Sequence, residues 1–351
     1  MKSPDSEREN SPSARVLALF PGALGDFVCF LPALRALSER GKVDLLLARS
    51  EYAALAPPNV TTRSLERYEI SRLFVVGSEG EQAIRRFFAP YESIYSWMGS
   101  GEEGFIRRLR AAAGGKVEFF PFRSSDSRMH MSDYYLTCVA GPASQKSAAA
   151  VRLQPEDILW AAEFAQGRGL GDRRILVLAP GSGAREKNWP VEFFLEVSRW
   201  WRCETGGQVL VVYGPAEEER LGEPGRWDGA IQVRGLSLGK VAALLSRCDL
   251  YLGNDSGLTH LAGALGIETI ALFGPTDAAQ WAPRGRSVTV VSRNVPCSPC
   301  SSSAMKRCAH RKCLAGLSPD AVTGLIRRLA ERRRPASSAR NPESVENIAT
   351  S

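Results

Sequence analysis

Short apolar, β-branched runs alternate with helical patterns along most of this chain. The runs form two series, a first at 16–20, 43–48, 73–76, 93–97 and 117–120, and a second at 174–179, 208–213, 231–234, 249–253 and 269–273. Apolar strands with helices between them, as predicted at 26–40, 81–88 and 103–113, are typical of parallel sheets covered on both faces. The sequence therefore predicts an α/β fold with two doubly wound, Rossmann-like domains facing a cleft. Ligands of such domains bind beyond the carboxyl ends of the strands.

The stretch 141–155, rich in Ala, Ser, Gly, Gln and Pro, separates the two series. The length of 351 residues suits two domains of about 150 residues each. We expect a first domain over 15–150, a second over 151–317 and a C-terminal helix over 318–335, which Ser318 caps and Pro319 begins. The ends, 1–14 and 336–351, are expected to be disordered.

Targeting signals and cysteine usage indicate the compartment. No apolar run approaches the roughly 20 residues that a membrane span needs, and the chain starts with polar and charged residues rather than a secretory signal. Cys29, Cys138, Cys203 and Cys248 stand singly in apolar or helical stretches, as reduced, buried thiols do. These features predict a cytoplasmic protein.

The positive charge is concentrated near the C-terminus. Of the net charge of +7, six arginines and one glutamate between Ile326 and Arg340 supply +5, which leaves +2 for the rest of the chain. The body is therefore not strongly basic, and no basic, aromatic-rich strand of the kind that stacks bases is present, so we expect no nucleic-acid partner. The arginines are either a solvated end of the last helix or a site of attraction to an anionic membrane face.

The strongest candidate site follows the strand at 249–253, where the sequence Asn-Asp-Ser-Gly-Leu-Thr-His occupies 254–260. A helix that opens here directs the amides of Ser256, Gly257 and Leu258 at an anion, as a diphosphate requires. His260 comes one turn after Ser256 and could donate a hydrogen bond to a phosphate oxygen. The alternative is an ordinary helix cap with a surface histidine.

Two more loops are expected at the same sheet edge. The sequence Phe-Gly-Pro-Thr-Asp at 273–277 carries the Thr276 hydroxyl, and the glycine-rich loop 180–190 carries Lys187 and Trp189. Because neighbouring strands of a sheet lie about 5 Å apart, the loops should converge, with Lys187 neutralising a leaving diphosphate. The alternatives are a solvated lysine and a packing tryptophan.

Competing phosphate motifs have the wrong spacing. The run from Gly235 to Lys240 has three residues between its glycines where a P-loop has four. The pair Gly181 and Gly183 has no third glycine at the Rossmann position, which disfavours a nicotinamide cofactor. No two aspartates are spaced Asp-x-Asp, so we expect neither a bridging divalent metal nor any other cofactor.

In the first domain, Gly22 and Gly25 permit a close approach of the backbone, and Asp26 stands where the following helix begins. An aspartate at this point is commonly a helix cap. The functional alternative is a general base that faces the diphosphate across the cleft.

These motifs together resemble glycosyltransferase family 9, the lipopolysaccharide heptosyltransferases. The resemblance rests on Pro-Gly-Ala-Leu-Gly-Asp at 21–26 with Pro32, on Pro-Gly-Ser at 180–182 with Lys-Asn-Trp-Pro at 187–190, on 254–262 and on 273–277. It implies the two-domain glycosyltransferase-B fold, with the acceptor bound by the first domain and the nucleotide sugar by the second. It also implies metal-independent, inverting transfer of heptose from ADP-L-glycero-D-manno-heptose to a lipopolysaccharide-core-type or other saccharide acceptor, lipid-linked at the inner membrane surface.

The resemblance further assigns roles to residues. Asp26 becomes the base and Lys187 the phosphate contact, Asp255 meets the donor sugar, and Glu217, with Glu218 as the alternative, lies near the nucleoside. The implied donor site comprises Ser182, Lys187, Glu217, Asp255, Ser256, Gly257, Leu258, His260 and Thr276. The competing functions are a nucleotide-sugar epimerase of the same fold and a binding protein without catalysis.

A last cluster combines Cys297, Cys300, Cys308 and Cys313 with His310. Four such ligands can hold zinc, although only the first pair has the usual short spacing. The alternatives are unpaired thiols or an occasional disulfide.

Overall fold

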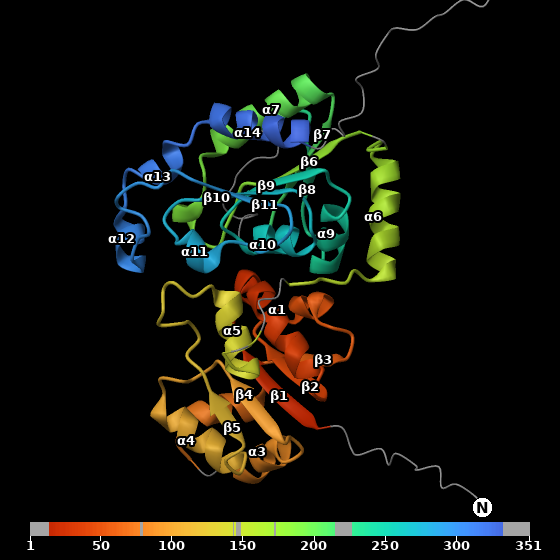
Figure 1. Cartoon of the computed structure of the whole chain (residues 1–351). Coiled ribbons are helices and arrows are strands. Elements are labelled where there is room, and N and C mark those ends of the chain that lie inside the picture. The colour runs from red at the N-terminus through yellow and green to blue at the C-terminus, as the bar shows by residue number, and fades with distance from the viewer. Residues whose placement is uncertain are drawn as a thin grey trace, which may run out of the picture.

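Two parallel α/β lobes, one above the other in Figure 1, make up the molecule. The computed structural model describes residues 14–77, 80–142, 144, 149–171, 173–214 and 227–332. Both sheets are parallel and have helices on both faces, which confirms the predicted α/β class and the two doubly wound sheets. None of the described helices is both long and apolar enough to cross a membrane.

The first sheet has the strand order β3-β2-β1-β4-β5. Because the order of the strands reverses between β1 and β4, the crevice at their carboxyl ends is the expected ligand site, and the helix that follows β1 carries Asp26 in its first turn. The strands are β1 (Arg15–Phe20), β2 (Lys42–Leu47), β3 (Val60–Ser64), β4 (Ser93–Ser96) and β5 (Val117–Phe119).

The second sheet has the order β11-β10-β9-β6-β7-β8, so the order in which its strands are added reverses between β6 and β9. The loops that follow these two strands carry Lys187 and Asp255, which places both residues at the second ligand crevice. The strands are β6 (Ile175–Ala179), β7 (Gln208–Val212), β8 (Ile231–Val233), β9 (Leu250–Asn254), β10 (Thr269–Phe273) and β11 (Val288–Ser292).

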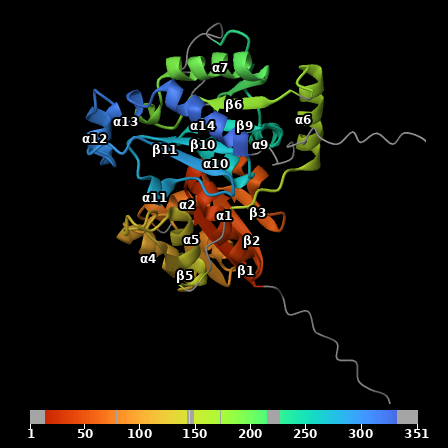
Figure 2. The same ribbon diagram turned by 45° about the horizontal axis from the view of Figure 1, so that its top comes forward.

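Helices and short 3-10 turns form four layers around the sheets (Figures 1 and 2). One continuous apolar core runs between the sheets and includes residues of both lobes, and separate cores lie under the two outer layers. The outer layer of the first sheet has α2 (Tyr68–Ser71), η2 (Arg72–Phe74), α3 (Glu81–Phe88) and α4 (Glu103–Ala112). The inner layers have α1 (Leu24–Ser38), η1 (Ser50–Leu55), α5 (Met131–Ala140), α6 (Pro155–Gly167), α9 (Leu238–Leu245) and α10 (Gly257–Ala264). The outer layer of the second sheet has α7 (Val191–Thr205), α13 (Lys312–Ala315) and α14 (Pro319–Arg332), and η3 (Arg185–Lys187), α11 (Ala278–Trp281) and α12 (Ser302–Arg307) lie in loops.

The edge strands differ from the sequence prediction. The apolar run 73–76, predicted as a strand, is instead the end of the 3-10 turn η2 and an extended tip, in which Leu73 is buried while Val75 and Val76 are exposed. The third strand of the sheet is β3, whose alternating exposure and polar sequence are those of an edge strand. The half-exposed edge strand β11 was likewise not predicted. Helix α1 begins at Leu24 rather than Asp26.

The two lobes meet where α1 and α10 touch at their N-terminal ends. A Cβ added to Gly257 would lie 2.6 Å from the Cβ of Leu24, and one added to Gly25 would lie 3.2 Å from the His260 ring. Only residues without a side chain allow this approach. Both helices therefore direct the positive ends of their dipoles into the region between the lobes.

We expect Gly257→Ala to lower the free energy of unfolding by about 1–3 kcal/mol, because its methyl group would force the lobes apart. Urea unfolding measures this. Gly167→Ala is the matched control, since a Cβ at the end of α6 meets no atom within 4 Å. Equal stability of Gly257→Ala and the wild type would contradict the close packing of these helices.

Candidate active site

Three loops of the second sheet converge on the carboxylate of Asp255. Its Oδ2 atom accepts a hydrogen bond of 2.7 Å from Lys187 Nζ and one of 2.6 Å from Thr276 Oγ1. Asp255 is 7% exposed, so this ion pair is shielded from water on the carboxylate side. The predicted convergence of the loops after β6, β9 and β10 is confirmed.

The loop that carries Lys187 is held by its own polar groups. Ser182 is buried, and its hydroxyl lies 2.6 Å from Asn188 Oδ1 and 2.7 Å from the Ala184 carbonyl. Trp189 is also buried, and its backbone amide donates to Asn254 Oδ1. The Ser182 hydroxyl therefore shapes the loop, and its contact with a donor stays a prediction.

Trp189 anchors this loop, as the sequence suggested. Its indole Nε1 donates a hydrogen bond of 2.9 Å to the carbonyl of Leu317, just before α14. The Asn254 side chain completes the frame, because its Nδ2 donates to the Pro180 carbonyl at 2.7 Å while its Oδ1 holds Trp189. The position of Lys187 thus depends on a rigid, buried network.

Helix α10 opens directly beside this network. Ser256 is its N-cap residue, and the Ser256 hydroxyl lies 3.1 Å from Thr259 Oγ1. The first amides of the helix, including those of Gly257 and Leu258, have no partner within the helix, because the first turn of any α-helix leaves its N–H groups free. The loops and the helix therefore offer an ammonium, hydroxyls and oriented amides at one place, as an anion site requires.

Asp26 lies across the boundary from this anion site, in the first turn of α1. Its Oδ2 accepts a hydrogen bond of 3.1 Å from the Ala23 amide, so the capping role considered for this residue is present. Burial raises the pKa of Asp26 above its ordinary value, although the positive charge of Arg123 opposes the rise. Lys187 and Asp255 also act on this pKa, in opposite directions, which places Asp26 within electrostatic range of the donor-side ion pair.

His260 faces the first lobe rather than solvent. It is 4% exposed, and its Nδ1 lies 3.6 Å from the Sγ atom of Cys29 on α1. Burial lowers the pKa of His260 to about 4, and the Asp255 carboxylate only partly opposes this effect. The imidazole is therefore neutral at physiological pH, and a hydrogen bond from it to a phosphate stays a prediction.

A second set of contacts between the lobes escaped the sequence analysis. Asp133 and Arg284 form a two-pronged ion pair, and His130 Nε2 lies 2.8 Å from the Ala282 carbonyl. The guanidinium of Arg123 stacks over the Trp281 ring at 5.1 Å. The members of each pair lie about 150 residues apart, and no motif marks them, so only the folded chain reveals them.

Other predicted residues lie elsewhere. Glu217 and its alternative Glu218 fall outside the described residues. The cysteines of the C-terminal cluster are free thiols, with Cys308 Sγ 3.6 Å from His310 Nδ1. Among the residues that the structure describes, no group of three or more His, Cys, Asp or Glu side chains is arranged to hold a metal ion.

We expect Lys187→Met to lower the free energy of unfolding by about 1–3 kcal/mol, because it leaves the buried Asp255 carboxylate without its cation. Adding Asp255→Asn should recover part of this loss. Thermal unfolding of the single and double variants measures the coupling, and Lys240→Met, on α9, is a control lysine outside the site. Additive effects of the two substitutions would contradict the ion pair.

The buried imidazole makes stability depend on pH. In the unfolded chain the His260 imidazole has its ordinary pKa of 6.5, whereas in the folded chain its pKa is about 4. Between these pH values the unfolded chain therefore binds a proton at His260 that the folded chain does not bind. Stability should therefore fall across this window as the pH decreases, by up to about 1.4 kcal/mol per pH unit from this group. Urea unfolding at a series of pH values should show that His260→Asn loses less stability than the wild type, and parallel curves would refute this account.

Comparison with known proteins identifies related sequences and folds. A sequence model described as glycosyltransferase family 9 (heptosyltransferase) matches residues 134–309, half of the chain. This segment contains Lys187, Asp255, His260 and Thr276 but not Asp26. Lipopolysaccharide heptosyltransferase 1 of Pseudomonas aeruginosa is 36% identical over 128 residues, which are 36% of this chain and 36% of that protein. The chain spans between 36% and 52% of the length of the first curated relatives that it matches.

Solved structures share the fold over most of the chain. The Escherichia coli ADP-heptose lipopolysaccharide heptosyltransferase II superposes with a TM-score of 0.66 and 16% identity, covering 91% of this chain and 99% of that one. The E. coli heptosyltransferase WaaC with ADP-2-deoxy-2-fluoro heptose has a TM-score of 0.58 and 20% identity, covering 90% and 99%. The fold is the glycosyltransferase-B fold, and the chain belongs to glycosyltransferase family 9.

Proposed function

We propose that this protein transfers a heptose from ADP-heptose to a saccharide acceptor of the lipopolysaccharide-core type, by an inverting and metal-independent reaction. The observation that carries the proposal is the position of Asp26, a partly buried carboxylate with a raised pKa, across the lobe boundary from the Lys187–Asp255–Thr276 cluster. A base and an anion site on opposite lobes suit transfer of a sugar between two substrates.

Asp26 is the general base of this reaction. The acceptor hydroxyl attacks the anomeric carbon of the donor sugar, its proton passes to the Asp26 carboxylate, and the bond to the diphosphate oxygen breaks. The raised pKa helps, since a carboxylate of higher basicity takes up the proton more readily as the new bond forms. The attack comes from the face opposite the leaving group, which inverts the anomeric carbon.

The leaving diphosphate is stabilised by groups of the second lobe. Lys187 supplies the positive charge, and the amides of Ser256, Gly257 and Leu258 supply hydrogen bonds that are already oriented. The Asp255 carboxylate holds the Lys187 ammonium in place and lies where it can meet the donor sugar. Ser182, His260 and Thr276 complete the donor site, with Glu217 near the nucleoside.

Family membership supports the proposed donor and acceptor. Heptosyltransferase WaaC has been solved with an ADP-heptose analogue, which supports ADP-heptose as the donor here. The first lobe holds the acceptor, a lipid-linked saccharide at the cytoplasmic face of the inner membrane, and the enzyme acts from the cytoplasm.

We expect Asp26→Asn to reduce kcat by about 10²-fold or more while the affinity for ADP-heptose stays close to that of the wild type. Initial rates and calorimetric titration with the donor measure the two quantities. Asp126→Asn, which alters an exposed aspartate of the same lobe, is the control. In the wild type, kcat/KM should rise with pH through a pKa above the ordinary aspartate range, because the base must be ionised, and Asp26→Asn should lack this limb.

The same assay separates the competing functions. Consumption of ADP-heptose without any acceptor would indicate an epimerase, and donor binding without turnover in the wild type would indicate a binding protein. Unchanged turnover of Asp26→Asn would remove Asp26 from the mechanism.

A further inference from the structure

The first lobe exposes an apolar tip. Val76 is 86% exposed, Val75 48% and Phe74 47%, and Tyr68 on the adjoining turn is 52% exposed. These four side chains make up more than half of the large hydrophobic residues exposed in the described chain. A run of three consecutive exposed apolar residues is unfavourable in water, and such a run marks a surface that binds a partner.

The apolar tip lies beside the carboxyl edge of the first sheet. The ring of Phe74 packs on Phe105, with 4.6 Å between the centroids, and Phe105 is in the first turn of α4. In a parallel α/β unit each helix runs back along the strand before it, so the first turn of α4 lies near the carboxyl end of β4. The same sheet edge carries Asp26, which follows β1.

The helices next to the tip carry more arginines than acidic residues. Helices α3 and α4 carry five arginines against the two glutamates in their first turns. Arg108 is tied to the tip, because its Nε donates a hydrogen bond of 2.6 Å to the Leu73 carbonyl. An apolar point next to helices with an excess of arginines has the chemistry of a membrane-surface site.

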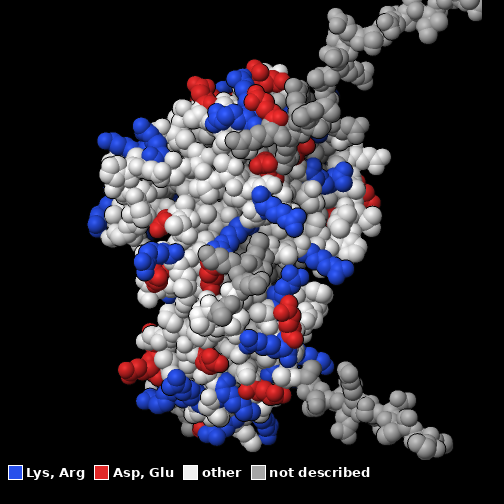
Figure 3. All heavy atoms as spheres, in the orientation of Figure 1, with Lys and Arg blue, Asp and Glu red and all other residues white. Residues whose placement is uncertain are grey.

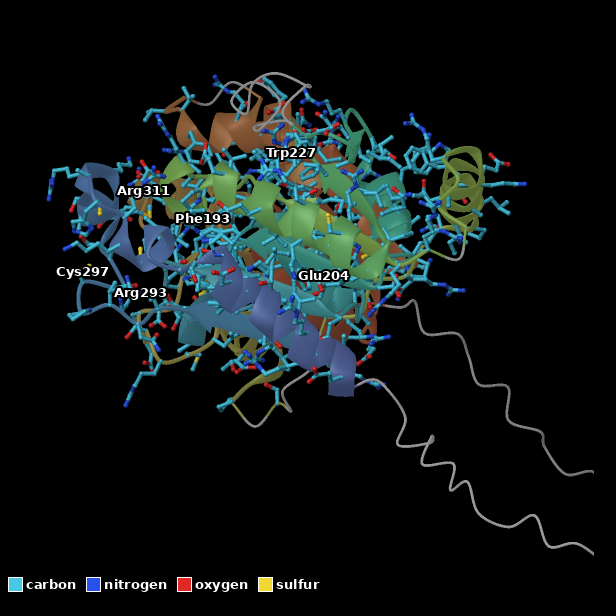
Figure 4. The ribbon with its side chains drawn as sticks, turned by 90° about the horizontal axis from the view of Figure 1, so that it is seen from above. Phe193, Glu204, Trp227, Arg293, Cys297 and Arg311 are labelled. Atoms are coloured by element: carbon cyan, nitrogen blue, oxygen red, sulfur yellow. The ribbon has the colours of Figure 1, made fainter. Side chains whose placement is uncertain are left out.

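The second lobe presents positive charge on the same side of the molecule. Between Ala278 and Pro319 the sequence has seven lysines and arginines and no aspartate or glutamate, and six of the seven remain once Arg284, which pairs with Asp133, is set aside. Figure 4 shows Arg293, Cys297 and Arg311 together at one side, on the segment that includes α12 and α13. In both Figures 1 and 2 this segment lies on the side that also carries α4, whereas α6 lies on the opposite side.

This basic segment is fixed to the candidate active site. The amide of Cys300 donates to the Pro275 carbonyl at 2.8 Å, and the hydroxyl of Ser298 donates to the Gly274 carbonyl at 2.5 Å. Both carbonyls belong to the loop that carries Thr276. Lys and Arg side chains line the outer edge of this lobe in Figure 3.

We propose that this docking face, formed by the apolar tip (Tyr68 and Phe74–Val76) and the basic segment 278–319, binds the surface of an anionic lipid bilayer. The valines enter the interfacial layer, and the cations of both lobes meet lipid phosphates. Cations that flank an apolar point favour a charged bilayer over a second copy of this chain, whose matching face would bring like charges together. The inference does not depend on the proposed reaction, since the binding needs neither donor nor acceptor.

Vesicle co-sedimentation of the full chain tests the apolar half of the face. The wild type should bind vesicles of phosphatidylglycerol mixed with phosphatidylcholine. The affinity of Val75→Ser/Val76→Ser for these vesicles should be at least about tenfold lower. Leu159→Ser is the matched control, because Leu159 is 65% exposed but lies on α6. Melting temperatures close to that of the wild type should show that these exposed substitutions leave the fold intact.

The basic half has its own test. Lys306→Gln/Arg307→Gln should weaken binding to the mixed vesicles about tenfold and leave binding to pure phosphatidylcholine unchanged. The exposed pair Arg173→Gln/Arg199→Gln, outside the docking face, should have a smaller effect. Raised salt should also weaken binding of the wild type.

Two results would overturn the proposal. One is equal vesicle binding by the tip variant and the wild type. The other is a wild type that ignores vesicles but forms a dimer by light scattering that the tip variant loses, which would identify a second copy as the partner. Failure of the proposed reaction would appear separately, as absent transfer to a detergent-dispersed acceptor with vesicle binding intact.

Discussion

Asp255 accepts hydrogen bonds from Lys187 and Thr276 on a single carboxylate oxygen, and this shared contact joins the loops after three strands of the second sheet. The strand order explains why the contact forms here. The order in which the strands are added reverses between β6 and β9. The connections after these two strands therefore lead away from each other and leave room for a ligand between them. The ion pair with Asp255 holds the Lys187 ammonium beside the first amides of α10, so the ammonium and the amides can act on an anion together.

The contact between α1 and α10 gives that attraction its direction. Two helices from different lobes place their N-terminal ends against one another, and glycines at Gly25 and Gly257 make the approach possible. The positive ends of both dipoles therefore act on the same small volume, and the partly buried Asp26 carboxylate stands at its edge. A carboxylate in this position is poorly hydrated, and this loss of hydration is the main cause of its raised pKa.

Much of this arrangement could be predicted from the sequence. Strands buried on both faces have continuous apolar sequences, and the loops of the candidate anion site contain recognisable turn residues. The two sheets and the convergence of Lys187, Asp255 and Thr276 followed from such local patterns. The edge strands β3 and β11 could not be predicted in this way. An edge strand needs only one apolar face, and the sequence of β3 is mostly polar. The run 73–76 misled for the opposite reason: only Leu73 joins a core, and the other three apolar side chains are exposed to solvent.

Contacts between the two lobes were beyond sequence reasoning altogether. The ion pair of Asp133 with Arg284 and the burial of His260 against Cys29 depend on how two lobes meet, and no periodicity or motif encodes that meeting. The individual residues look like ordinary surface charges and an ordinary histidine until the lobes are placed together.

The hydrogen bond from the Trp189 indole to the Leu317 carbonyl spans 128 residues of sequence. A ribosome makes a protein from its N-terminus, so the loop that holds Lys187 is synthesised long before the carbonyl that anchors it. Until that later segment has left the exit tunnel and docked, the loop lacks a permanent support. The nascent second lobe thus acquires its final anion-binding geometry only after Leu317 has been synthesised, when the first lobe has had time to fold.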